Sequence, residues 1–234
     1  MNKPDSITNV PTGQADAIAQ SKFSLPLRVV AHFFSFVFHP LFIPLIATWY
    51  LAFIHEGYFI GFTPHDKILT LLKTGFNTII FPFATILLLK AVGFIKSIFL
   101  KTRRERVLGY VTANIFYFWI YLVFHNQPEV PSILTACMLG IFLSSCAGLF
   151  ANTYYKISMH GLGMGALIGL LLIIIYNDSL YPVFVPMVMV LLITGLVCTS
   201  RLMISDHSPF DVYTGVLFGI GCQLIAAAFT GVNT

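Results

Sequence analysis

The chain has 234 residues, of which 57% are hydrophobic and only 9% are charged, and its formal net charge is +4. A soluble domain of this length does not carry so much apolar surface, and the modest net charge argues against a nucleic-acid partner. The composition therefore excludes a soluble enzyme and predicts a protein embedded in a bilayer.

The N-terminal residues 1–28 are polar and mixed in charge. They lack the basic start followed by an apolar stretch that defines a signal peptide. We interpret them as a polar tail that is disordered or lies on the membrane surface. Residues 29–234 show no internal repeat and no low-complexity tract, so we expect them to form one membrane-embedded domain.

Apolar runs recur along this domain, each near the ~20 residues that a helix needs to cross a bilayer. The runs are 30–54, 69–95, 107–124, 133–150, 162–176, 183–197 and 212–229. They predict an all-α, polytopic transmembrane helical bundle of about six to seven helices. The number stays open because Pro40 and Pro44 interrupt the first run, and His39-Pro40 could make it a re-entrant or interfacial piece.

Polar residues interrupt the apolar runs in three clusters. These are 96–106 (KSIFLKTRRER), 156–160 (KISMH) and 201–211 (RLMISDHSPFD). Two apolar runs separate each cluster from the next, and an even number of crossings returns a chain to the same membrane face. We therefore expect all three clusters at one surface. Ionisable groups at a membrane helix junction are costly to desolvate, which indicates a function there.

The third cluster has the spacing Ser-Arg-x5-His-x3-Asp, formed by Ser200, Arg201, His207 and Asp211. The guanidinium fork of an arginine fits a phosphate, and a histidine attacks or transfers a proton near neutral pH. An aspartate one helical turn beyond a histidine can hold one imidazole nitrogen. The alternative is an ordinary helix start, in which Ser208 is the N-cap and Asp211 closes a capping box.

This spacing resembles the third motif of the type 2 phosphatidic acid phosphatase superfamily, which also contains soluble acid phosphatases and the vanadium haloperoxidases. The resemblance implies that His207 attacks phosphorus and forms a phosphohistidine, and that Asp211 orients His207. It also implies that Arg201 and Ser200 bind the phosphoryl oxygens. No metal and no cofactor are implied, because Arg and Lys side chains neutralise the charge.

The second cluster resembles the superfamily motif Pro-Ser-Gly-His. It keeps Ser158 and His160 and replaces the proline and the glycine. By resemblance, Ser158 binds a phosphate oxygen and His160 protonates the leaving alkoxide. Lys156 would be an additional phosphate contact, whereas the alternative is a lone interfacial histidine.

The first cluster resembles the superfamily motif Lys-x6-Arg-Pro. Lys96 and Arg103 keep the spacing, and Arg104 stands in place of the proline. If the stretch is helical, Lys96, Arg103 and Arg106 share a face, and the resemblance implies that they bind the substrate phosphate. Lys101 with Arg104 or Arg106 is a second possible pair. A positively charged loop that only sets membrane topology is the third reading.

The remaining histidines lie near predicted helix ends or turns, and no carboxylate completes a metal site with them. We interpret them as interface residues. They are His32, His39, His55, His65 and His125.

The membrane body and the three clusters together predict an integral membrane phosphatase that hydrolyses a lipid phosphate or lipid diphosphate. We expect a multi-pass protein of a bacterial inner (plasma) membrane, whose partners are the bilayer and the lipid phosphate substrate. A phosphotransferase of the same fold and a non-catalytic protein that binds or transports anions remain as alternatives. His207 with Asp211 favours turnover, because binding alone needs only cations.

Overall fold

The computed structural model describes residues 24–100, 102–177, 182–204 and 207–232. The main helices are α2 (Leu25–Val37), α3 (Ile43–Trp49), α4 (Pro64–Gly75), α5 (Phe81–Ala91), α6 (Arg103–His125), α7 (Ser132–Ala151), α8 (Met159–Asn177), α9 (Phe184–Ile204) and α10 (Pro209–Thr230). Three short helical segments join them: η1 (Tyr50–Ile54), η2 (Glu56–Phe59) and η3 (Phe76–Ile80). These segments contain no strand, so the all-α prediction is confirmed.

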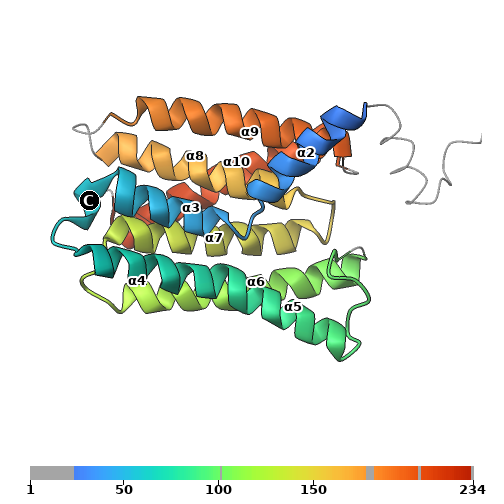
Figure 1. Cartoon of the computed structure of the whole chain (residues 1–234), viewed down its shortest axis with the longest axis horizontal. Coiled ribbons are helices and arrows are strands. Elements are labelled where there is room, and N and C mark those ends of the chain that lie inside the picture. The colour runs from blue at the N-terminus through green and yellow to red at the C-terminus, as the bar shows by residue number, and fades with distance from the viewer. Residues whose placement is uncertain (1–23, 101, 178–181, 205–206, 233–234) are drawn as a thin grey trace, which may run out of the picture.

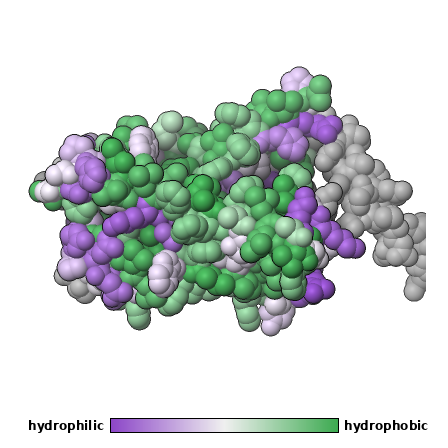
Figure 2. Space-filling model, turned by 60° about the horizontal axis from the view of Figure 1, so that its bottom comes forward, coloured by the Kyte–Doolittle hydropathy of each residue, from purple (hydrophilic) through white to green (hydrophobic). Residues whose placement is uncertain are grey.

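Six helices in the described part of the chain are long and apolar enough to cross a membrane. They are Pro64–Ala91, Arg103–His125, Ser132–Ala151, Met159–Asn177, Phe184–Ile204 and Pro209–Thr230. Figure 1 shows them lying side by side along the long axis of the molecule. In Figure 2 a broad apolar surface separates hydrophilic residues gathered toward the two ends. The protein is therefore a polytopic helical membrane protein.

The first predicted run, 30–54, is not one helix but two shorter apolar ones, Leu25–Val37 and Ile43–Ile54. The break surrounds His39-Pro40, where the proline ring fixes φ and removes a backbone donor. In Figure 1, α2 and α3 follow one another along the bundle. Most of the expected polar tail lies outside the described residues, and its last part already belongs to α2, which begins at Leu25.

The second predicted run, 69–95, begins earlier than its hydropathy suggests. The helix starts at Pro64 because Thr63 and Asp66 form a capping box that satisfies its first backbone N–H groups. It continues through the π-helical turn of η3 into α5 and ends at Ala91. Gly93, with a φ of 86°, then turns the chain in a conformation that favours glycine.

Helices α7, α8 and α10 form the tightly packed centre of the bundle. The contact between α8 and α10 is so close that a Cβ atom at Gly165 would collide with the Val216 carbonyl. A Cβ atom at Gly219 would collide in the same way with the Leu162 carbonyl. Small residues of this kind let two membrane helices pack backbone against backbone.

Helices α6, α8 and α10 all begin at one end of the bundle, where α5, α7 and α9 end (Figure 1). We call this the site end. The three polar clusters lie there, as the even number of crossings between them predicts. The fold therefore brings segments about fifty residues apart in sequence to one membrane surface.

Candidate functional site

The second and third clusters are joined directly at the site end. The backbone N–H of Ser158 donates to the Asp211 carbonyl at 3.1 Å. The hydroxyl of Ser158 accepts from the Gly161 N–H at 3.3 Å and so caps the start of α8. The first residues of α8 and α10 are therefore held next to each other, and with them His160 and His207.

His207 is oriented by a backbone carbonyl. Its Nδ1 lies 3.0 Å from the Lys156 carbonyl oxygen, which can only accept a hydrogen bond, so Nδ1 carries the proton. In a neutral ring this leaves the lone pair on Nε2. Only 10% of the His207 side chain is exposed, which holds the ring in place. In this tautomer Nε2 is the basic nitrogen of the ring.

Asp211 forms the capping box of α10. Its Oδ2 accepts from the Ser208 N–H at 2.8 Å, and the Ser208 hydroxyl accepts from the Asp211 N–H at 3.2 Å. The same Oδ2 is 4.0 Å from His207 Nδ1, which is too long for a hydrogen bond. The helix-start reading of Asp211 is therefore confirmed. Its carboxylate still lies close enough to stabilise positive charge on His207 electrostatically.

Arg201 and His160 meet at Ser35 of α2. Arg201 Nη1 donates to the Ser35 hydroxyl at 2.9 Å. His160 Nε2 lies 2.9 Å from the Ser35 carbonyl oxygen and 3.2 Å from its hydroxyl, so Nε2 carries the His160 proton. The ring of His39 contacts the ring of His160 edge to face, with 5.4 Å between centroids. Ser35 and His39 belong to this site, although the sequence patterns place neither there.

One sequence signal could have marked these two residues. Ser35 and His39 are polar, four residues apart and followed at once by Pro40, in an otherwise apolar run. The superfamily motifs do not extend to this run, and the sequence alone indicates that His39 is an interface residue.

The two serine hydroxyls predicted to bind phosphate face their own helices. The Ser200 hydroxyl donates to the Leu196 carbonyl at 2.7 Å, and Ser158 is fully buried as the cap of α8. Each would have to rotate to reach a substrate oxygen.

The first cluster lies at the site end but makes its described contacts elsewhere. Helix α6 begins only at Arg103, so Lys96 lies in the preceding loop and the predicted helical register does not apply. The buried carboxylate of Glu105 accepts from the Lys96 N–H at 2.7 Å. Arg103 donates to the Thr153 carbonyl, and Arg106 Nε donates to the side chain of Asn152 at 3.3 Å.

These contacts tie the first cluster to the loop that precedes the second cluster. Lys101 lies outside the described residues.

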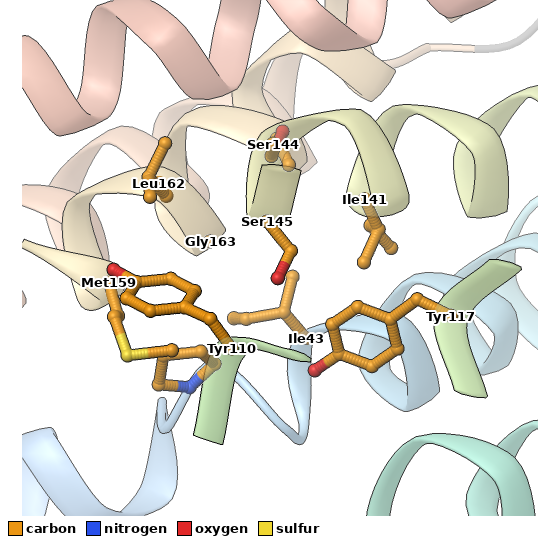
Figure 3. Close-up of a pocket in the computed structure, with 11 residues that line it drawn as sticks. Ile43, Tyr110, Tyr117, Ile141, Ser144, Ser145, Met159, Leu162 and Gly163 are labelled. Carbon is orange, nitrogen blue, oxygen red and sulfur yellow. The ribbon is translucent and has the colours of Figure 1, made fainter. Parts of the chain in front are cut away.

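A small cavity of about 40 Å³ lies inside the bundle next to this site (Figure 3). Pro40 and Met159, which adjoin His39 and His160, contribute to its wall. The side chains of Ser145 and Tyr117 point toward it. Its lining is mostly apolar, and a cavity of this size is too small for a lipid chain.

Within the described residues, no group of three or more His, Cys, Asp and Glu side chains is arranged to hold a metal ion. No family model, no curated protein and no solved structure matches this chain. The functional assignment therefore depends on the residues and geometry of the site itself.

The His207 imidazole should stay neutral until the pH falls to about 4. Burial first, and then the positive charges of Arg201 and Lys156, lower its pKa from the usual 6.5 to about 4, although the Asp211 carboxylate and the hydrogen bond to the Lys156 carbonyl act in the opposite direction. A histidine in the unfolded chain titrates near 6.5. Between these pH values the unfolded state binds more protons, so the free energy of unfolding should fall as the pH falls from 6.5 through 4.

Nitrogen NMR of 15N-histidine-labelled protein in detergent would follow this titration directly, with the resonance assigned by comparison with His207→Gln. That variant should also lose part of the acid destabilisation seen in the wild type. A His207 titration near pH 6.5 would contradict the burial and charge argument.

Proposed function

We propose that this chain is an integral membrane phosphatase that hydrolyses a lipid phosphate or lipid diphosphate through a phosphohistidine intermediate. The observation that carries the proposal is the setting of His207. Its Nδ1 is engaged by a backbone carbonyl, which leaves Nε2 as a neutral nucleophile. It lies at the same end of the bundle as Arg201 and His160, two groups that phosphoryl transfer requires.

The reaction would proceed in two steps, transfer of the phosphoryl group to His207 and hydrolysis of the phosphohistidine. The negative charge of the bound phosphate favours a second proton on His160, at Nδ1, because Nε2 stays bonded to the Ser35 carbonyl. His207 Nε2 forms a bond to phosphorus while the bond from phosphorus to the leaving oxygen breaks, and the protonated His160 gives its Nδ1 proton to that oxygen and becomes neutral. A water molecule then attacks phosphorus, His160 takes a proton from it, and the bond to His207 breaks to release inorganic phosphate. Arg201 neutralises charge on the phosphoryl oxygens in both steps, and the nearby Asp211 carboxylate stabilises the positively charged His207.

A lipid substrate follows from the surroundings of the site. His160 and Arg201 lie in the terminal turns of membrane-spanning helices, and α2 beside them exposes large apolar side chains. A phosphate headgroup at the bilayer surface reaches this depth without leaving its lipid. A bacterial plasma membrane is the setting we propose.

Purified protein should release phosphate from a short-chain phosphatidic acid in detergent, and the rate should persist in excess EDTA. Orthovanadate should inhibit, because it adopts the trigonal-bipyramidal geometry that the site is proposed to bind most tightly. The measurement is phosphate release with and without each reagent. Activity that EDTA abolishes and Mg²⁺ restores would contradict the proposed mechanism.

One observation favours a non-catalytic anion-binding protein as the second candidate. The hydroxyls of Ser158 and Ser200 are both engaged within the fold, and Asp211 caps a helix without a hydrogen bond to His207. Such a protein would bind vanadate or phosphate without releasing phosphate from any ester. Transfer of the phosphoryl group to an added alcohol in place of water would indicate a phosphotransferase of the same fold.

A further inference from the structure

We propose that the broken first segment supplies two positioning residues to the site: Ser35, which fixes Arg201 and His160 relative to each other, and His39, which holds the ring of His160. This inference rests on the proposed function. It adds a segment that none of the three polar clusters contains. The break at His39-Pro40 is then a functional feature of the fold.

Ser35 joins the two groups that would act on either side of the phosphate. Its hydroxyl accepts from Arg201 at 2.9 Å, and its carbonyl accepts from His160 at 2.9 Å. Ser35 is only 8% exposed, whereas large apolar side chains elsewhere on α2 are exposed. The face of α2 that carries Ser35 is the one packed against the bundle, where α9 brings Arg201. A buried residue that bridges a cation and an imidazole restricts both to one geometry.

His39 holds the ring of His160 by an edge-to-face contact, 5.4 Å between centroids. Its own orientation is fixed by the Leu41 N–H, which donates to His39 Nδ1 at 3.4 Å. That N–H belongs to the turn after Pro40, so the break itself orients the ring. Burial, and then the charge of Arg201, lower the pKa of His39 to about 4. A neutral His39 supports His160 without adding a further positive charge beside Arg201.

The proposed role makes a prediction that depends on the leaving group. A positioned acid matters most when the leaving oxygen is strongly basic, as in an alkyl phosphate. It matters little for p-nitrophenyl phosphate, because nitrophenolate leaves without a proton. A residue that only supports the fold would affect both esters equally. Comparison of the two esters therefore separates positioning from general stability.

The test compares His39→Gln with His32→Gln, a matched change on the exposed face of α2. We expect His39→Gln to lower kcat for octyl phosphate by about 10²-fold with little change in KM, since a small misplacement of a catalytic group costs that much. The loss for p-nitrophenyl phosphate should be less than about threefold. His32→Gln should leave both rates near the wild-type values.

Ser35→Ala provides an independent measurement. It removes one hydrogen bond to the Arg201 guanidinium but keeps the backbone carbonyl that holds His160. Inhibition by orthovanadate should weaken roughly tenfold, the usual effect of losing a hydrogen bond to a charged group. Unchanged or stronger inhibition would overturn the role of Ser35.

Equal losses of both esters in His39→Gln, or the same selective loss in His32→Gln, would overturn the role of His39. If the wild-type protein hydrolyses neither ester, the proposed function fails and this inference fails with it. If it hydrolyses both and the His39 variant shows no selectivity, the inference alone fails.

Discussion

Replacing His207 with alanine should lower turnover by at least ~10³-fold while the protein still folds and inserts into the membrane. The substitution removes the nucleophile, so neither the bond to phosphorus nor the second step can occur. It also removes the hydrogen bond to the Lys156 carbonyl, but the link between Ser158 and Asp211 still holds α8 and α10 together. Phosphate release and thermal unfolding in detergent measure the two effects.

The control is His125→Ala, which removes an exposed histidine at the far end of α6 and should leave the rate unchanged. Quenching during turnover with alkaline detergent, which preserves the acid-labile bond between phosphorus and nitrogen, should trap the label of a 32P-labelled lipid phosphate on His207, as peptide mass spectrometry at neutral or alkaline pH would show. A phosphohistidine at any other position would refute the assignment, as would a His207→Ala variant that keeps a tenth of wild-type turnover.

The second large effect is expected at Arg201. Arg201→Ala should lower kcat/KM by about 10²- to 10³-fold, because removing one positioned donor from a charged transition state costs that much. Arg201→Lys should recover only a small part, since an ammonium group cannot reproduce the two-pronged geometry of a guanidinium. Arg201 also donates to Ser35, so the lysine variant loses that contact as well.

The matched control is Lys90→Ala, which removes an exposed cation from the last turn of α5 at the same end of the bundle. If both variants lose activity equally, Arg201 acts only through the general positive charge of this surface. Raising the ionic strength would then reduce wild-type activity to a similar extent, because exposed charges are screened by salt. A specific phosphate contact predicts a large loss in the Arg201 variants alone.

The sequence predicts most of the fold because a bilayer imposes strict requirements on it. Each membrane-spanning helix must be long and apolar, and six of the predicted runs appear as such helices. Differences arise where local chemistry overrides hydropathy. Thr63 and Asp66 start α4 earlier than expected, and His39-Pro40 divides the first run into two helices. Both pairs of residues are visible in the sequence, but where each helix begins or ends depends on the packed structure.

The candidate site is less predictable because its contacts join segments far apart in sequence. The order of the three clusters predicts one shared surface. It does not predict that Ser35 lies between Arg201 and His160, or that a backbone carbonyl orients His207. A carbonyl is present at every residue and leaves no mark in the sequence. The role of Asp211 was ambiguous for a related reason, since one carboxylate fits both a helix cap and a histidine partner.

The close packing of α8 against α10 has a consequence for biosynthesis. α8 carries His160, whereas His207 lies just before α10, the last helix of the described chain. The backbone of α8 at Gly165 and that of α10 at Gly219 must contact the opposite helix before His160 and His207 come together. A nascent chain therefore has no complete site until α10 docks into the bundle. The order of helix assembly therefore withholds the proposed lipid phosphatase activity from a partly inserted polypeptide.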